Sequence, residues 1–383
     1  MLIFIAIIST LLGSVWFYIW KSLVLSSHLP SPLQNTLLII FILSFALQLL
    51  RWIRSLKIDN RPIILFFAYF TLGLMTHLFF GVLAKDLVKI IVFYGSGKSF
   101  SLEPFTPVLN GIVFAICFIA NLWGLRTALM GPIIRNINIT LPNWPLAQDG
   151  LRVVQISDLH VGPMIKKSYV ENVVRKAQAL NPDILAITGD LGDGEVQDSI
   201  EDLEPLRQLY AKHGVYYVTG NHEYYWKGQE WIDKAKDLGF VVFHNEGKTI
   251  ALPEKDIWLA GVPDPTCSRF FPGQISDPLA AMQGNPNANA AKILLAHQPK
   301  SCFAAQEAGF DFMLCGHTHW GQFFPVSLLV GLFNPYHKGL NSHKNMWVYV
   351  NAGTGFWGPP LRLGVPSEIT CFILKTEKSG AKL

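Results

Sequence analysis

Carboxylate, amide and imidazole side chains recur at the ends of short apolar segments in the second half of this 383-residue chain. In chain order they are Asp158, His160, Asp190, Asn221, His222, His297, His317 and His319. Each group follows a run of residues, such as Ile184–Thr188, whose composition is typical of a buried strand. Because the ends of parallel strands meet at one edge of an α/β sheet, we expect these side chains to share one cleft.

The donor types of this set indicate metal binding. Oxygen and nitrogen donors without a suitably placed thiolate favour Mn, Fe, Zn or Mg over a cysteine-held structural zinc. Seven of these eight side chains acting as ligands are too many for one ion, and they suit two ions about 3.5–4 Å apart that share a bridging carboxylate. Gly189 lets the backbone turn sharply or approach a ligand closely, and so presents the Asp190 carboxylate at the mouth of the sheet.

The order of these motifs resembles the calcineurin-like metallophosphoesterase superfamily. The matching pieces are Asp158-x-His160, Gly189-Asp190, Gly220-Asn221-His222-Glu223, His297 and Gly316-His317-x-His319. Each piece alone is weak, but the complete ordered set is very specific, and it covers about residues 130 to 375. The run from Gly316 to Gln322, together with Pro360-x-Arg362 and Glu368-Ile369, is similar to the YaeI/YkuE-type branch. The apolar N-terminus is similar to transmembrane metallophosphoesterase-domain proteins.

The resemblance implies a role for each matching residue. One metal ion is expected on Asp158, His160, Asp190 and His319, and a second on Asp190, Asn221, His297 and His317. Manganese is the favoured ion. The two ions would acidify a shared water, whose hydroxide attacks phosphorus in a phosphomonoester, phosphodiester or diphosphate. His222 would stay off the metals and either protonate the leaving oxygen or hydrogen-bond the phosphoryl group.

Three further polar residues leave alternatives open. Glu223 either orients an imidazole or has an ordinary surface or helix-start role. Asp193 resembles a second acidic site residue, but we interpret it first as a loop residue. Arg362 either clamps a second phosphate bidentately or forms a salt bridge with Glu368.

The first third of the chain predicts a membrane region. Hydrophobic residues make up 50% of the chain and charged residues only 15%, and the apolar excess lies almost wholly before residue 129. Four apolar runs, at 2–20, 36–50, 62–83 and 106–125, predict about four transmembrane helices.

A cleaved signal peptide is disfavoured, because no Lys or Arg precedes Lys21 and no Ala-x-Ala site follows. We therefore expect a transmembrane region at 1–128 and a phosphoesterase domain at 129–383. His77 interrupts the third run and is interpreted as a helix-packing hydrogen bonder.

The charges of the loops predict the orientation. Basic residues gather after the second and fourth runs, at Arg51, Arg54, Lys57, Arg61, Arg126 and Arg135. This bias places both termini and the catalytic domain in the cytoplasm of a multi-pass inner (plasma) membrane protein. The stretch 83–94 is either an interfacial amphipathic helix or an extension of the third helix.

The fold class of the second half follows from the order of its elements. From about residue 132, strands first alternate with helices and later come mostly as strands. That order predicts an α/β domain with a largely parallel part and an antiparallel tail; the resemblance implies a four-layer α/β/β/α sandwich. A helix is expected at 200–212. Five cysteines without CxxC spacing indicate a reducing compartment, and the absence of a basic, aromatic-rich block disfavours nucleic acid.

The substrate is constrained less strongly. The apolar segment 323–333, with Trp320, Phe356 and Trp357, predicts a hydrophobic rim beside the active site that suits lipid-linked phosphates or diphosphates. The alternative is that the segment is a buried strand or helix. Two other functions stay open: a catalytically silent regulatory membrane protein that binds metal, and an anchored nucleotide or cyclic-nucleotide phosphodiesterase. The sequence does not predict the oligomeric state.

Overall fold

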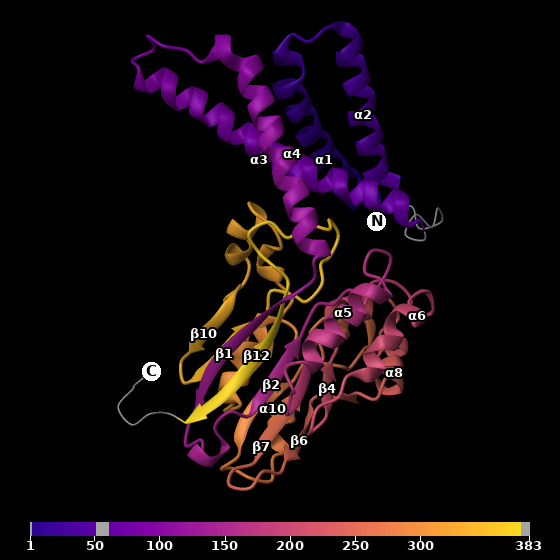
Figure 1. Cartoon of the computed structure of the whole chain (residues 1–383), viewed down its shortest axis with the longest axis vertical. Coiled ribbons are helices and arrows are strands. Elements are labelled where there is room, and N and C mark those ends of the chain that lie inside the picture. The colour runs from indigo at the N-terminus through magenta and orange to yellow at the C-terminus, as the bar shows by residue number, and fades with distance from the viewer. Residues whose placement is uncertain (1, 51–60, 377–383) are drawn as a thin grey trace. The chain divides into compact units, whose positions relative to one another are not determined.

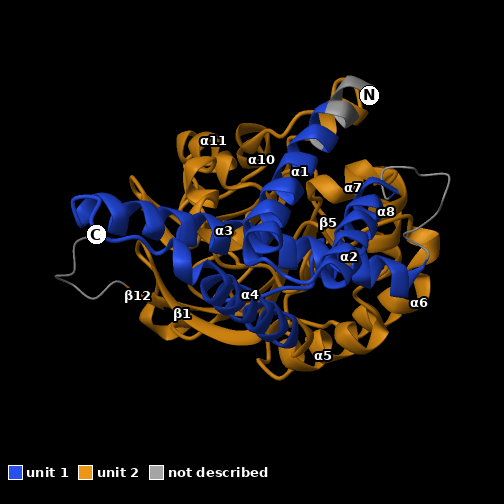
Figure 2. Cartoon of the chain, turned by 90° about the horizontal axis from the view of Figure 1, so that it is seen from above, with its two compact units in different colours: residues 1–126, 358–363 blue, residues 127–357, 364–383 orange. Residues whose placement is uncertain are grey.

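A computed structural model describes residues 2–50 and 61–376, and the chain separates into two compact units. The first unit comprises residues 1–126 and 358–363, and the second comprises 127–357 and 364–383 (Figures 1 and 2). The short stretch 358–363 is thus assigned to the first unit although it lies far along the sequence.

Long helices make up most of the first unit. They are α1 (Leu2–Leu23), α2 (Ser31–Leu50), α3 (Pro62–Gly95) and α4 (Thr106–Leu129). Among the described residues, three segments are long and apolar enough to cross a membrane, namely Ser31–Leu50, Pro62–Gly95 and Glu103–Leu129. The span expected at 2–20 is a helix, and its crossing of a membrane stays a prediction. The stretch 83–94 continues α3 without a break, so it is an extension of that helix. The basic residues at 51–57 lie outside the described residues.

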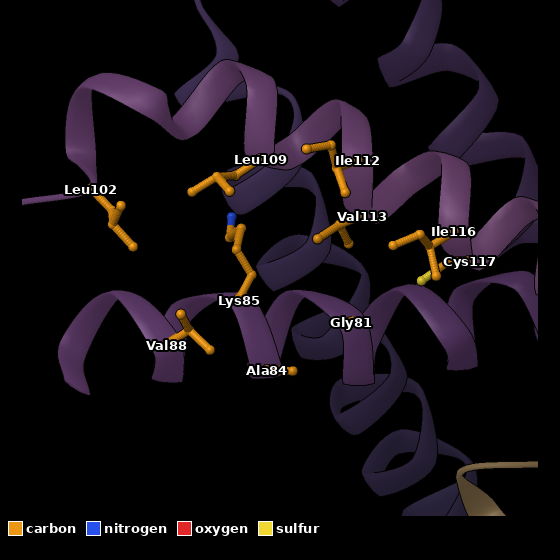
Figure 3. Close-up of a pocket in the computed structure, with 10 residues that line it drawn as sticks. All are labelled: Gly81, Ala84, Lys85, Val88, Leu102, Leu109, Ile112, Val113, Ile116 and Cys117. Atoms are coloured by element: carbon orange, nitrogen blue, oxygen red, sulfur yellow. The ribbon is translucent and has the colours of Figure 1, made fainter. Parts of the chain in front are cut away.

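Polar side chains inside the helical unit are hydrogen-bonded to one another. His77 Nδ1 lies 3.2 Å from Asn121 Oδ1, which agrees with its expected packing role. The Lys85 ammonium donates to Ser22 Oγ and Asn110 Oδ1, each at 2.7 Å. Lys85 also lines a pocket of about 330 Å³ between α3 and α4, whose other lining residues are apolar (Figure 3). Interhelical contacts of this kind satisfy polar groups that would otherwise be costly in an apolar helix bundle.

The first sheet of the second unit has the strand order β1-β12-β2-β3-β4-β5. Its strands are β1 (Ile133–Leu141), β12 (Glu368–Thr376), β2 (Arg152–Ile156), β3 (Ile184–Thr188), β4 (Val215–Val218) and β5 (Val241–Val242). Strands β2 to β5 are parallel, β12 is antiparallel to β2, and β1 is parallel to β12. The parallel part of the prediction is therefore confirmed in this sheet.

The second sheet has the order β10-β11-β9-β8-β7-β6. Its strands are β10 (Gly339–His343), β11 (Met346–Val350), β9 (Phe312–Cys315), β8 (Ala291–Leu295), β7 (Ile257–Gly261) and β6 (Glu246–Ile250). Only the edge pairs β10–β11 and β6–β7 are antiparallel, so the expected antiparallel tail is wrong for the central strands. The helices α10 (Pro278–Gln283) and α11 (Cys302–Glu307) provide the crossovers that parallel neighbours require.

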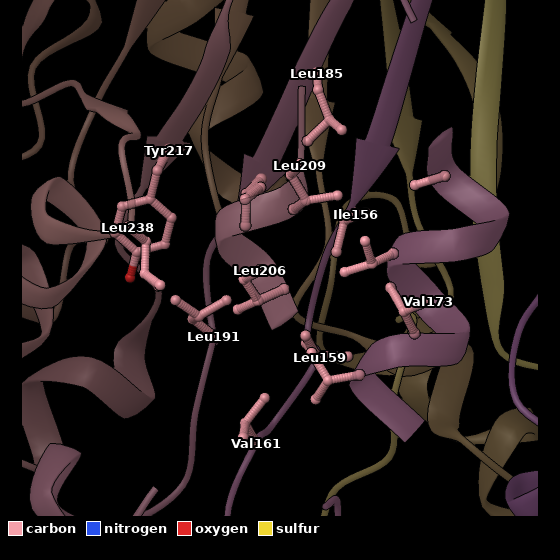
Figure 4. Packing of buried hydrophobic residues seen from close by; sticks show 14 of the residues in the cluster. Ile156, Leu159, Val161, Val173, Leu185, Leu191, Leu206, Leu209, Tyr217 and Leu238 are labelled. Carbon is pink, nitrogen blue, oxygen red and sulfur yellow. The ribbon is translucent and has the colours of Figure 1, made fainter. Parts of the chain in front are cut away.

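Three apolar clusters hold the second unit together as four layers. One cluster joins the facing sides of the two sheets, for example Ile184 of β3 and Ile293 of β8. A second covers the outer side of the first sheet with α5 (Lys167–Gln178), α8 (Gly228–Asp237) and the turn before β4, and Figure 4 shows Ile156 and Val173 within it. A third packs α10 and α11 on the second sheet. This arrangement is an α/β/β/α sandwich.

The helix expected at 200–212 is the clearest local error. Helix α6 covers only Ile200–Leu203 and passes into a 3₁₀ turn at Glu204–Gln208. Pro205 lacks a backbone N–H and its ring clashes with the preceding turn, so a regular α-helix cannot continue through it.

Candidate metal centre

The predicted ligands follow five strand ends of the two sheets. Asp158 and His160 come two and four residues after β2, Asp190 two after β3 and His297 two after β8. Asn221 and His222 begin α7 (Asn221–Tyr225) after β4, and His317 and His319 follow β9. The structure brings all eight of these side chains together, as the hydrogen-bonding and ion-pair distances below show.

A first group consists of Asp158, His160 and His319, whose ligand atoms all lie within 4.8 Å of one another. His160 Nε2 lies 3.0 Å from His319 Nε2, which in turn is 3.4 Å from Asp158 Oδ1. Two imidazole nitrogens and a carboxylate oxygen that converge in this way form a donor set suited to a divalent cation.

A second group consists of Asp190, His297 and His317. His297 Nε2 lies 3.2 Å from each of Asp190 Oδ2, Asn221 Oδ1 and His317 Nδ1. His297 Nδ1 is 2.8 Å from the Thr188 carbonyl, so it donates its proton there and leaves the Nε2 lone pair for a metal. Burial, reinforced by the charge of His297, lowers the pKa of His317 to about 3, which keeps this imidazole neutral as a ligand must be.

Asp190 faces both groups. Its Oδ2 lies 3.2 Å from His297 Nε2 in the second group and 3.9 Å from His160 Nε2 in the first. Asp190 is almost fully buried, at 2% exposed. Asp190 is thus within 4 Å of one histidine of each group, and its bridging of two metal ions stays a prediction.

The backbone at the ligands is unusual. Five of them have positive φ angles: Asp158 (53°), His160 (55°), Asp190 (51°), His317 (69°) and His319 (48°). Residues other than glycine rarely adopt this left-handed conformation, and it costs of order 1–3 kcal/mol each when the surroundings impose it. Such strain gathers at functional sites, so its concentration at these five positions supports a functional role for the cluster.

Two glycines allow the ligand loops to approach closely. A Cβ on Gly189, which has φ +86°, would lie 2.6 Å from both Gly220 N and His297 Nδ1. A Cβ on Gly316 would lie 2.0 Å from Ser157 Oγ and 2.1 Å from Asp158 Oδ2. Both positions therefore require glycine for steric reasons, and Gly189 requires it for its left-handed backbone as well.

Glu223 organises the backbone around the centre. Its fully buried carboxylate accepts hydrogen bonds from the backbone N–H groups of Asp190 (3.1 Å), Leu191 (2.7 Å) and Gly220 (2.6 Å). Gly220 is the N-cap of α7, so the helix-start alternative is correct and the surface alternative is wrong. In the described part of the chain, no hydrogen bond joins Glu223 to an imidazole, which was the other expectation.

Asp193 positions His222, although the sequence alone led us to interpret Asp193 first as a loop residue. His222 Nδ1 hydrogen-bonds Asp193 Oδ1, and His222 Nε2 lies 4.0 Å from Asp190 Oδ2. Asp193 Oδ2 is also 3.2 Å from His160 Nδ1. Burial alone would lower the pKa of His222, but Asp190 and Asp193 raise it to about 10; bound dications would act in the opposite direction. The spacing of Asp193, three residues after Asp190 in the same strand-end loop, was the available signal.

Arg362 belongs to the stretch 358–363 of the first unit. Its side chain is fully buried, and its backbone N–H donates to the Gly124 carbonyl at 2.9 Å within the helical unit. The Glu368 carboxylate, the alternative partner, pairs with Arg135. In this conformation Arg362 presents no surface to a substrate, and its role as a phosphate clamp stays a prediction.

The predicted hydrophobic rim is only partly present. Residues 323–333 form neither a strand nor an α-helix but two 3₁₀ turns, Val326–Leu328 and Val330–Leu332, so the buried alternative is wrong. Trp357 is exposed, and its ring centroid lies 5.6 Å from that of His222. Phe356 is buried at 2% exposed, and Trp320 is partly buried with Arg135 over its ring, so neither extends the rim.

Comparison with known proteins places these residues in context. Residues 151–321 match the family described as calcineurin-like phosphoesterase. A "Transmembrane protein with metallophosphoesterase domain" from Danio rerio is 35% identical over 272 residues, covering 69% of this chain and 62% of that protein. An "Uncharacterized metallophosphoesterase" from Helicobacter pylori is 31% identical over 363 residues, covering 87% of this chain and 95% of that protein. The "Uncharacterized metallophosphoesterase YkuE" from Bacillus subtilis is 27% identical, covering 61% and 82%. The chain thus spans less than two thirds of the Danio rerio relative and nearly all of the Helicobacter pylori one.

Proposed function

This chain belongs to the calcineurin-like phosphoesterase family, and we propose that it is a membrane-anchored hydrolase that cleaves phosphoester or diphosphate bonds with two divalent metal ions. The observation that supports this proposal best is the pair of ligand groups on either side of Asp190. A site with one carboxylate between two sets of oxygen and nitrogen donors suits the two-metal arrangement of many phosphatases. Its donors accept Mn, Fe, Zn or Mg, and manganese is the ion that we propose to test first.

Each residue has a definite task in this proposal. Asp158, His160 and His319 would hold one ion, Asn221, His297 and His317 the other, and Asp190 both. When bound, the ions supply Lewis acidity and an acidified water as the nucleophile. His222, whose Nε2 is on the Asp190 side, donates a proton to the leaving oxygen. Asp193 holds Nδ1 of the same imidazole, which leaves Nε2 directed toward the centre.

Removal and return of metal tests the activity itself. The full-length protein in detergent is stripped with a chelator and assayed on a soluble aryl phosphodiester, an aryl phosphomonoester and an aryl diphosphate. We expect no turnover of the stripped protein and recovery of turnover on at least one ester when Mn²⁺ is restored. Protein that binds two equivalents of Mn²⁺ yet hydrolyses none of them would instead support the silent regulatory function.

The membrane anchorage has its own proposal and test. We propose that the apolar helices span the inner (plasma) membrane and that the catalytic unit faces the cytoplasm, on the basis of the basic residues at Arg61 and Arg126 and those at 51–57. A reporter enzyme that works only in the cytoplasm should be active when it is fused after Leu383, and one that works only in the periplasm should be inactive there. Activity of a periplasmic-type reporter at the same position would reverse this orientation.

A further inference from the structure

Two aromatic side chains, Trp357 and Tyr225, border His222, a third, Phe270, borders Tyr225, and all three are open to solvent. The ring centroids of Trp357 and Tyr225 lie 5.6 Å and 5.4 Å from that of His222, and Phe270 lies 6.1 Å from Tyr225. Their exposed fractions are 53% for Trp357, 45% for Tyr225 and 48% for Phe270. We call these three residues the aromatic rim. Because nearly half or more of each side chain is exposed, burial in the core does not explain why such large apolar groups lie at the proton donor.

The rim is joined to a second exposed apolar surface. The Gln322 side chain and the Trp357 backbone exchange two hydrogen bonds, Nε2–H to the Trp357 carbonyl and Trp357 N–H to Oε1, each 2.8 Å long. This exchange ties Trp357 to the loop that carries His319. A second apolar stretch, residues 324–333, begins two residues after Gln322, and we call it the apolar turn segment. Its exposed side chains are Phe324, Leu328, Leu329, Leu332 and Phe333, between 42% and 74% exposed.

The apolar turn segment has no charge to offer a ligand. From residue 323 to residue 337 the sequence contains no Asp, Glu, Lys or Arg. Three of its five exposed side chains are leucines, which bury alkyl groups but do not stack on a planar base. The surface therefore matches an aliphatic chain better than a nucleobase.

We propose that the aromatic rim and the apolar turn segment bind the aliphatic chain of an amphiphilic phosphoester whose phosphate is at the metal centre. This inference rests on the proposed function. In the reaction, water loses one proton to solvent as its oxygen bonds to phosphorus, the P–O bond to the alcohol breaks, and the alcohol oxygen takes a proton from His222, which regains one from solvent. The alcohol carrying the chain thus lies on the His222 side, where the rim is. The apolar helices of the first unit suit a protein that works among such amphiphiles.

A homologous series of substrates tests this inference. The detergent-solubilised, Mn²⁺-loaded protein is given 4-nitrophenyl alkyl phosphodiesters with ethyl, octyl and dodecyl chains. Nitrophenolate and alcohol release are both measured, so that either orientation of the ester is counted. We expect kcat/KM for the dodecyl ester to exceed that for the ethyl ester by at least about tenfold, the effect of burying roughly two methylene groups. Trp357→Ala and Phe270→Ala should each lower this ratio.

A matched control separates the rim from surface aromatics in general. Tyr210 is 70% exposed and borders none of these residues in the ring contacts described, so Tyr210→Ala should keep the wild-type ratio. The inference would be overturned if the dodecyl-to-ethyl ratio of kcat/KM is near one in the wild type, or if Trp357→Ala and Phe270→Ala leave that ratio unchanged. Turnover of the ethyl ester in the same assay would still support the proposed function. Preference for a thymidine ester over the dodecyl ester would overturn it in favour of a planar base. No turnover of any ester would overturn both.

Discussion

Asp193 hydrogen-bonds the imidazole of His222 through Oδ1 while its Oδ2 lies 3.2 Å from Nδ1 of His160. One carboxylate therefore orients both the proposed proton donor and a proposed metal ligand. Its place follows from the backbone, because Asp193 N–H donates to the Val161 carbonyl at 2.8 Å and joins the loops after β3 and β2. Burial alone would raise the pKa of Asp193, but the charges of His160 and His222 outweigh it and keep the carboxylate ionised.

Asp193→Asn should slow catalysis without emptying the site. The amide keeps the shape and one acceptor oxygen but loses the negative charge that favours a protonated His222, and weakening such outer partners of a metal site costs about 10- to 100-fold. We expect kcat to fall by that factor, while the Mn²⁺ content of the purified protein stays at two ions per chain. Asp198→Asn removes an exposed acid from the same loop and serves as the control. A wild-type kcat in Asp193→Asn would show that its contact with His222 has no catalytic part.

His222→Ala should remove the proton donor. General acid catalysis contributes about 10²- to 10⁴-fold, so we expect a loss of kcat in that range. The loss should be smaller for an aryl ester with an acidic leaving group than for an alkyl ester, since the former needs less protonation. Equal losses on the two esters would indicate that His222 binds the phosphoryl group instead. His213→Ala, outside the motif set, should leave both rates unchanged.

Glu223→Gln should destabilise the catalytic unit. Four backbone N–H groups donate to this buried carboxylate, and an amide replaces one acceptor oxygen by an NH₂ group that faces donors. A buried donor left without an acceptor costs about 1–3 kcal/mol, so the melting temperature of the detergent-solubilised protein should fall. Glu230→Gln alters a carboxylate that is 43% exposed and should melt like the wild type. An unchanged melting temperature for Glu223→Gln would contradict the stabilising role of these hydrogen bonds to Glu223.

The sequence was most informative where chemistry and strand ends coincide. The eight motif residues Asp158, His160, Asp190, Asn221, His222, His297, His317 and His319 come together because short buried strands of parallel sheets end at the same edge. The role of Glu223 was harder to predict, because it depends on backbone amides of Asp190 and Leu191 that are distant in sequence. Arg362 was assigned from its motif alone, and no local pattern reveals that its side chain is fully buried or that its backbone N–H donates to Gly124 of α4.

The central claim is that Asp190 serves two metal ions, and Asp190→Asn tests it most directly. The full-length wild type, Asp190→Asn and the control Asp233→Asn, an exposed acid on α8, are purified in detergent with Mn²⁺. Metal content and aryl phosphodiester hydrolysis are then measured on the same samples. The proposal predicts two ions and turnover for the wild type and the control, and fewer than two ions with no turnover for Asp190→Asn. Two ions and wild-type turnover in Asp190→Asn would contradict it.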